Sequence, residues 1–583
     1  MKSPQVAFLR LVRSTSIAVL LFASLASLAP RIAFAADDAP SGQEPEDDLA
    51  QPAPSTDRDD FPRLVLDTGR TPVKPPEVDL VRFQIHGEYQ FRYEHLRSFP
   101  LDVTASSLGA HPGATSDSLG QNDFAYHWLR ITPRLQMSDW LEIIGQMDVL
   151  TGTLLGDLAH DTSADQTPRD QYNGLSNVQP RWLYAEVKTR YGLWRVGQQP
   201  SHWGMGIVAN DGDHPSLFGD YRYGNISERI LFATKPAGKD SPLTVALAGD
   251  LVFRDNTALL TQGDRAFQGI LAVSWEKNEK QIGLYGVYRH QSHDRTSDND
   301  LFPYADTIDV GVIDLAGRFV EPVPGTDAFA FGAGEIAAIF GSTTALRTND
   351  QVQSGDTTKI LSYGGAVQVG VAHRASCGCG DAASHPEDNT FGDVVGQVEI
   401  GYASGSADPY ADSSHRFTFD PNHKIGLVLF DEVMRFQSAR SSVAASDPLL
   451  TNGGRPPPGV DLLPSNGGVF GAEYINPTFI VRPRPWLDLK GGVVVAQSTS
   501  DMVDPYRTAL QGYTNYRGGD PHRRDLGVEL DGGTEGRFRL DYGMTMMLGA
   551  QAGILFPGGA LADATGQTMK APWLAVGRAG LLF

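Results

Sequence analysis

The chain has 583 residues, with 48 lysines and arginines against 69 aspartates and glutamates, and a formal net charge of −21. So large an excess of acid excludes nucleic acid as a partner, because phosphate binding needs a basic surface. Only two cysteines occur in this length, which excludes a fold held together by disulfides.

The amino terminus has the pattern of a secretory leader. Basic residues between Lys2 and Arg13 precede an apolar stretch over 17–29, and the small-residue motif Ala-Phe-Ala follows at 33–35. The apolar stretch is too short for a spanning helix and ends at Pro30, so a signal anchor is the weaker alternative. We expect residues 1–35 to be a signal peptide.

Residues 36–79 form a separate acidic lead-in. Between 36 and 60 there are nine acidic residues, four prolines and a single base, Arg58. Such a segment cannot bury enough apolar surface to offset its ordering entropy. We expect a disordered periplasmic linker, with a pore-plugging or partner-docking tail as the alternative.

From Val81 to Glu94 apolar and polar residues alternate without an error. Successive side chains of a strand point to opposite faces, so this segment separates an apolar surface from a polar one. The pattern recurs as far as Phe583. It predicts an all-β fold over residues 80–583: a single closed transmembrane antiparallel β-barrel of about eighteen strands with long extracellular loops. The strands are expected near 81–95, 124–137, 140–152, 179–190, 193–201, 226–235, 242–253, 268–276, 280–290, 308–321, 328–341, 361–374, 390–402, 468–482, 486–498, 524–535, 537–556 and 571–583.

The connections between these strands are sorted by parity. Long ones follow odd-numbered strands, as at 96–123, 153–178, 202–225, 403–467 and 499–523. Tight turns follow even-numbered strands, as near 138–139, 191–192, 277–279, 483–485 and 534–536. This asymmetry is typical of outer-membrane barrels of Gram-negative bacteria, with both termini in the periplasm. The exception is a longer turn at 375–389.

Outer-membrane lipid and lipopolysaccharide are therefore the expected surroundings. Aromatic side chains should form girdles at the headgroups near the strand ends. The tryptophans assigned to these girdles are Trp128, Trp140, Trp182, Trp194, Trp275, Trp486 and Trp573.

Three segments carry a family resemblance: the hairpin Trp182–Gln199 ending Arg195-Val196-Gly197-Gln198-Gln199, the strand Arg524–Asp531, and the strand end Gly553–Gly559. They resemble the alginate-export type of barrel and its relatives in exopolysaccharide secretion, and similar motifs occur in general porins. The resemblance implies a monomeric barrel that exports a polysaccharide through an arginine-lined lumen, with periplasmic export-complex partners. The family has a second arginine where this chain has Gln198, which counts against strong anion selectivity.

Charged residues on the polar faces are the candidate pore lining. They are Arg82, Arg92, Arg130, Arg134, Glu142, Arg195, Lys490, Arg537, Arg539 and Asp541. Rings of basic side chains select anionic permeants. For any single residue, however, pairing with a charge on a neighbouring strand is the favoured interpretation, since buried charges are normally paired.

The sequence contains no nucleophile elbow, zincin motif or phosphate-binding loop. Cys377 and Cys379 suit a local disulfide or free thiols better than a metal. The acidic stretches 210–213 and 297–300 suit solvated loops, with calcium or lipopolysaccharide binding as the alternative. We expect no cofactor, no metal and no enzyme activity. The alternatives to polysaccharide export are a general or solute-selective porin and, third, an outer-membrane hydrolase.

The connection at 403–467 carries apolar groups that a solvated loop does not need, in Arg416–Asp420 and Gly426–Phe430. Long connections without regular structure are often lids or constrictions. We hypothesise that this loop plugs or narrows the pore. The alternative, of nearly equal weight, is a hairpin that extends two strands above the membrane.

Overall fold

A computed structural model describes residues 81–99, 123–155, 177–219, 224–238, 240–294, 305–347, 354–373, 393–446, 459–484, 486–540 and 543–583. The predicted signal peptide (1–35) and acidic lead-in (36–79) lie outside these residues. So do the acidic stretch 297–300, the turn with Cys377 and Cys379, and Asp541.

Long strands make up most of the described chain. They are β1 (Arg82–Arg97), β2 (Asp123–Ser138), β3 (Leu141–Leu155), β4 (Asn177–Thr189), β5 (Gly192–Pro200), β6 (Ile226–Thr234), β7 (Leu243–Arg254), β8 (Asp264–Lys277), β9 (Lys280–Asp294), β10 (Ala305–Pro322), β11 (Ala328–Thr343), β12 (Thr358–His373), β13 (Asp393–Ala403), β15 (Ala472–Arg484), β16 (Leu487–Ser498), β17 (Asp525–Arg539), β18 (Thr545–Pro557) and β19 (Trp573–Leu582). The two-residue β14 (Ser413–Ser414) pairs in parallel with β12.

Helical segments are few in the described residues and lie in the connections. They are α5 (Arg435–Ser446), α6 (Pro505–Ala509), a π-helical turn (Leu429–Met434) and 3-10 turns at Leu260–Gln262, Val460–Leu462 and Gly559–Leu561. None of the described helices has the length and apolar character needed to cross a membrane.

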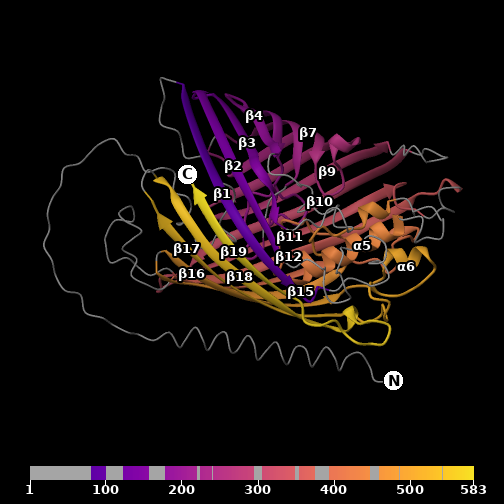
Figure 1. Ribbon diagram of the computed structural model, residues 1–583. Helices are drawn as coiled ribbons and strands as arrows, with labels where there is room; N and C mark the ends of the chain where they lie inside the picture. The colour runs from indigo at the N-terminus through magenta and orange to yellow at the C-terminus, as the bar shows by residue number, and fades with distance from the viewer. Residues whose placement is uncertain are drawn as a thin grey trace, which may run out of the picture. The chain divides into compact units, whose positions relative to one another are not determined.

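The sheet closes on itself. Each long strand pairs antiparallel with the next, and β13 pairs with β15 past the short β14. The last strand pairs with the first, from Glu88–Leu582 to Arg97–Trp573, and Phe583 exchanges two backbone hydrogen bonds with Gly87, at 2.8 and 3.0 Å. Figure 1 shows β1 and β19 side by side in the wall. The predicted closed antiparallel barrel of eighteen spanning strands is confirmed.

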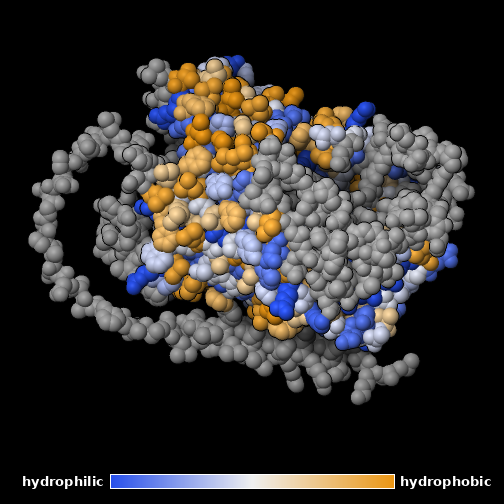
Figure 2. Space-filling view, viewed as in Figure 1, coloured by the Kyte–Doolittle hydropathy of each residue, from blue (hydrophilic) through white to orange (hydrophobic). Residues whose placement is uncertain are grey.

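The two faces of the wall differ as the alternation predicts. On β1, Phe83 and Ile85 face outward and are 60% and 50% exposed, whereas Arg92 and Glu94 face inward and are 1% and 0% exposed. Apolar residues spread over the outer surface of the strands in Figure 2. An outer wall of exposed apolar side chains, with every strand edge paired, is suited to lipid.

The predicted girdle is found at the short-turn rim and fails at Trp128 and Trp182. Trp182 lies opposite the buried Gln146 of β3 and shares the inward parity of Tyr184. Trp140, Trp194, Trp275 and Trp486 are exposed and lie at the short-turn end of their strands. Trp128 is instead buried, with the Arg130 guanidinium 4.9 Å from its ring centroid. It shares the inward parity of Arg130, so the girdle assignment of Trp128 is wrong.

One predicted turn is also wrong. The hairpin expected at 534–536 turns only after Arg539, and the ladder runs through the glycines, with Gly532 opposite Ala552 and Gly536 opposite Leu548. The Phe538 ring lies over Gly536, so this glycine makes room for an aromatic side chain rather than for a turn. Leu540, which the predicted strand 537–556 would place inside a strand, therefore lies at the turn after β17.

Replacing Ile131 by arginine tests the lipid face. Ile131 lies in the middle of β2, opposite Gly87 on β1 and Met147 on β3. An arginine near the bilayer midplane should lower the free energy of unfolding by about 2–4 kcal/mol. Denaturant unfolding in phospholipid vesicles would measure this. Thr132→Arg, one residue along on the lumen face, should have a smaller effect, and equal effects would contradict the assignment of faces.

Candidate functional site: a lumen occupied by two inner loops

The connection after β13 lies inside the barrel. We call its described residues, 404–446 and 459–471, the long inner loop. Phe417, Phe419, Leu427, Leu429 and Phe430 are at most 1% exposed. Their core includes lumen-facing wall residues: Ala337, Ala366, Val494, Leu555 and Leu574. Each large apolar side chain buried in this way stabilises the packing by about 1.5–3 kcal/mol. The apolar groups singled out in the sequence thus fill the barrel interior, as the plug hypothesis predicts.

A carboxylate on the wall holds the tip of the long inner loop. The Glu529 side chain on β17 accepts hydrogen bonds from the backbone N–H groups of Leu427, Val428 and Leu429, at 2.5, 2.7 and 2.7 Å. Gly426 precedes them with φ +72°, and a Cβ there would lie 2.5 Å from a Glu529 oxygen. The site therefore requires glycine next to the carboxylate. Hydrogen bonds to a charged group are the stronger ones, so this contact fixes the loop against the wall.

A second connection also turns inward. We call residues 201–219 together with 224 and 225 the short inner loop. Glu335 on β11 accepts hydrogen bonds from the backbone N–H groups of Met205 (2.5 Å) and Ile207 (3.3 Å). The Trp203 ring stacks on Tyr285 of β9 at 5.2 Å. Glu335 holds the short inner loop in the same manner as Glu529 holds the long one, from another part of the wall.

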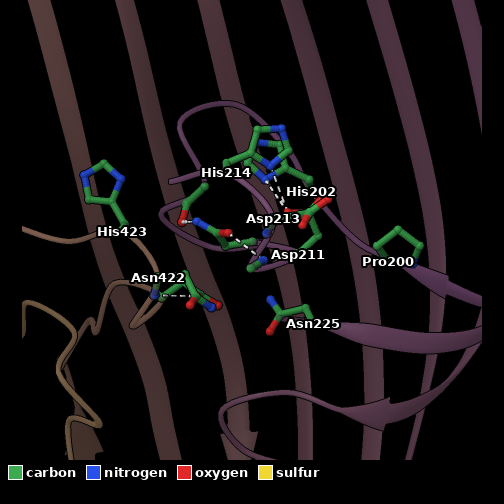
Figure 3. Close-up of polar contacts among 12 residues, drawn as sticks. Pro200, His202, Asp211, Asp213, His214, Asn225, Asn422 and His423 are labelled. Atoms are coloured by element: carbon green, nitrogen blue, oxygen red, sulfur yellow. Dashed lines mark hydrogen bonds and ion pairs between the residues drawn. The ribbon is translucent and has the colours of Figure 1, made fainter. Parts of the chain in front are cut away.

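The two inner loops contact each other within the lumen. The Asp420 N–H donates to the Ile207 carbonyl at 2.8 Å, and the His423 ring hydrogen-bonds to the Met205 carbonyl at 3.0 Å. Figure 3 shows Asn422 and His423 facing the short inner loop. On its other side, Lys490 of β16 donates to the Leu217 carbonyl at 2.6 Å. The loops therefore reach from β9 and β11 to β16 and β17.

His423 also forms an ion pair with the wall. Its Nε2 lies 2.9 Å from Glu399 of β13, which accepts a further hydrogen bond from the Tyr474 hydroxyl at 2.6 Å. Burial opposes the charged imidazole, but the Glu399 carboxylate and the Met205 carbonyl outweigh it and raise the pKa of His423. The protonated histidine thus stabilises the closed arrangement.

Most of the predicted pore-lining residues form ion pairs or contact an inner loop. The pairs are Arg92–Glu94, Arg130–Asp148, Arg134–Glu142, Arg195–Glu186, and Arg537 with both Asp488 and Glu535. Lys490 instead contacts the short inner loop. Arg82 and Arg539 lie at strand ends on the short-turn side, and Asp541 lies outside the described residues. The favoured pairing across neighbouring strands is confirmed for Arg130, Arg134, Arg195 and the Arg537–Asp488 pair, whereas Arg92–Glu94 and Arg537–Glu535 each lie within one strand. Pore lining in the sense of permeant contact stays a prediction.

The acidic stretch 210–213 was expected to be a solvated loop, and this is wrong. Asn210 and Asp211 are 2% and 7% exposed within the short inner loop. Asp213 pairs with Arg130 at 3.0 Å. Burial acts to raise the pKa of Asp211. The hydrogen bond with His214, and the attraction of His214 and His202 when they are protonated, outweigh burial and hold that pKa well below the usual range.

No protein-family model matches the sequence, and neither does any curated protein. Among solved structures, the chain is similar to OccAB1 of Acinetobacter baumannii, at 8% identity and a TM-score of 0.43, over 86% of this chain and 97% of that one. OccK8 (OprE) of Pseudomonas aeruginosa matches at 6% identity and 0.41, over 86% and 98%. OmpT, an outer membrane protein of Vibrio cholerae, matches at 9% identity and 0.33, over 87% and 99%.

Similarities this low carry no argument about function, and the strand pairing alone establishes the closed barrel. The chain is a closed antiparallel β-barrel of eighteen spanning strands, with two inner loops in its lumen.

Glu529→Ala tests the anchor of the long inner loop. It removes the acceptor of three backbone N–H groups, and leaving such groups unsatisfied costs about 1–3 kcal/mol each. We expect the open population to rise about tenfold or more, seen as larger or more frequent openings in planar bilayers. Glu142→Gln is the control, because Glu142 pairs with Arg134 on the wall near the short-turn end. Unchanged conductance in Glu529→Ala would contradict an anchoring role.

Asp420 makes closure depend on pH. Burial raises its pKa to about 7, although hydrogen bonds from Asn422 and Asn256 oppose the rise. A carboxyl with a raised pKa holds a proton in the closed state that a released loop gives up. Closure is therefore strongest below about pH 4 and weakens as the pH rises to about 7. The contribution of His423 is lost as the pH rises through its raised pKa, in the same direction.

We therefore expect higher bilayer conductance at about pH 8 than at about pH 5. Asp420→Asn should reduce this difference in conductance, and the pH dependence that His423 contributes should remain. Asp255, which lies near Asp420, is paired with Arg289 and has a lowered pKa, since these contacts outweigh its burial, so it stays ionised throughout. A pH response of full size in Asp420→Asn would contradict the assignment.

Proposed function

We propose that this chain is an outer-membrane channel for the passive passage of small solutes, closed at rest by its two inner loops. The observation that carries the proposal is the docking of both loops inside an eighteen-stranded barrel. Barrels of sixteen to eighteen strands are wide enough for an aqueous channel. Glu335 and Glu529 hold the two inner loops inside the barrel, and without these loops the channel would be open.

Small solutes fit these contacts better than a polymer does. A polysaccharide has to thread the whole lumen at once, which requires both inner loops to leave together. The wall arginines at 130, 134 and 195 are engaged by carboxylates rather than presented as a ladder for an anionic chain. Polysaccharide export, which the family resemblance implies, is therefore the second candidate.

The same proposal makes the chain a channel rather than a hydrolase. Three buried inward carboxylates, Glu335, Glu399 and Glu529, accept hydrogen bonds from the inner loops or from Tyr474. This engagement supports a role in holding loops in place.

Deleting residues 412–462 tests the channel directly. Removal of most of the long inner loop should clearly raise single-channel conductance and the rate at which small sugars and amino acids swell proteoliposomes. Heat-modifiable migration of the variant in gel electrophoresis, together with resistance to protease, would check that the barrel still folds. Since the deletion exposes apolar wall residues such as Val494 and Leu555, Glu529→Ala serves as the second, milder variant.

The permeant separates the two candidates. Small solutes should enter the deletion variant at rates set by size, with little effect of an anionic polymer such as alginate. Blockage by the polymer at low concentration, together with its measured transfer across the membrane, would favour polysaccharide export. Unchanged conductance in both variants, with stable barrels, would reject gating by the loop.

A further inference from the structure

Two histidines and an aspartate converge in the short inner loop. His214 Nδ1 lies 2.8 Å from Asp211 Oδ1, and His202 Nδ1 lies 3.8 Å from the same oxygen. One ligand atom from each residue falls within 4.8 Å of the others. The two rings are stacked, with centroids 3.8 Å apart, beside the carboxylate in Figure 3.

These donor types and distances match a transition-metal site. Imidazole nitrogen and carboxylate oxygen bind Zn²⁺ at about 2.0–2.2 Å, which puts neighbouring ligand atoms of a tetrahedral site about 3.3 Å apart. The observed 2.8 and 3.8 Å lie on either side of that separation. Shifts of about half an ångström would therefore bring both nitrogens and the oxygen into the first coordination sphere.

The surroundings hold the carboxylate in place. Asp211 Oδ1 accepts a hydrogen bond from the Asp213 N–H at 2.9 Å, and the Asp211 carbonyl accepts one from Arg181 at 2.8 Å. Metal sites depend on such supporting contacts to orient their ligands. Asn210 adds a turn, since its side-chain oxygen accepts from the Gly212 N–H at 3.0 Å.

The local charge also permits a cation. Arg130 and Arg181 are the positive groups, and Asp148, Asp211 and Asp213 are the negative ones, so the cluster carries one surplus negative charge with neutral histidines. His202 and His214 keep 21% and 19% of their side-chain surface exposed, which lets an ion and a water molecule reach them.

We propose that His202, Asp211 and His214 bind a borderline divalent cation such as Zn²⁺, with water in the fourth position. Three protein ligands plus an open position are typical of sites that exchange a ligand. The ion would tie residue 202, two positions after β5, to the returning arm at 211–214. It would thereby fix the short inner loop in the lumen independently of Glu335.

Titration of the full-length folded barrel with Zn²⁺ and Co²⁺ tests the site. The wild type should bind one more Zn²⁺ per chain than His214→Ala or Asp211→Asn, whose affinity at this site should fall about 100-fold or more. Cobalt should give the visible absorption bands of a tetrahedral complex in the wild type alone. The matched control is His290→Ala, which removes an exposed histidine paired with Asp309 on the neighbouring strand and should bind like the wild type.

Heat-modifiable migration in gel electrophoresis would confirm that each variant is folded. If His214→Ala does not fold, His202→Ala takes its place. Cys377 and Cys379 are unchanged in every protein, so thiol binding cancels in the comparison. Equal zinc stoichiometry and equal cobalt spectra in the wild type and in the folded histidine variants would overturn the proposal. The cluster would then be a hydrogen-bonded pair, His214–Asp211, with His202 stacked on it.

Discussion

The pairing of β19 with β1 is the contact on which the rest of the structure depends. In hydrocarbon no water is present to satisfy backbone N–H and C=O groups, so an open strand edge is not tolerated. The ladder from Glu88–Leu582 to Arg97–Trp573, extended by Phe583 and Gly87, removes that edge. The Phe583 ring lies so close to Gly87 that a Cβ would be 2.4 Å from it. Closure thus fixes the diameter of the barrel and creates the interior that the loops enter.

The interior then sets a second requirement, because parts of the lumen wall are apolar. Val494, Leu526, Leu555 and Leu574 are at most 1% exposed although they lie on or near inward faces, and they share one core with the long inner loop. An empty aqueous lumen would leave this surface in water. Backbone N–H groups of an inserted loop need acceptors as well, and Glu335 and Glu529 supply them. Apolar wall patches and inward carboxylates therefore act together to make insertion of the loops favourable.

The strands of the barrel wall could be predicted from the sequence because strand alternation and the parity of loop lengths are local patterns. Both follow from the two-residue period of a strand and from the asymmetry of the two membrane surfaces. The prediction of a turn at 534–536 failed because Gly536, which accommodates the Phe538 ring, resembles a turn glycine in the sequence. The assignment of Trp128 to the girdle was wrong because a tryptophan in a strand can face either side of the wall. Parity placed Glu335 and Glu529 inward, but which inward carboxylates meet a loop depends on residues that are distant in the sequence, 130 positions away for Glu335 and 102 for Glu529. The cluster of His202, Asp211 and His214 is local in the sequence, but it escaped notice because it forms only when the loop turns back on itself.

Opening this barrel requires the loops to leave contacts of two kinds. Withdrawal of the long inner loop exposes buried apolar surface on both loop and wall, which is unfavourable in proportion to area. It also breaks the hydrogen bonds to Glu529, but water can replace those at much lower cost, because both partners become solvated. The apolar contacts therefore dominate the free energy of closure, and the carboxylates determine where the loop docks. Removing an anchor is a different case, because Glu529→Ala leaves N–H groups buried without an acceptor in the closed state and should therefore lower the stability of that state. A solute or ion that binds the closed or open arrangement preferentially can then shift the population only by its difference in affinity for the two.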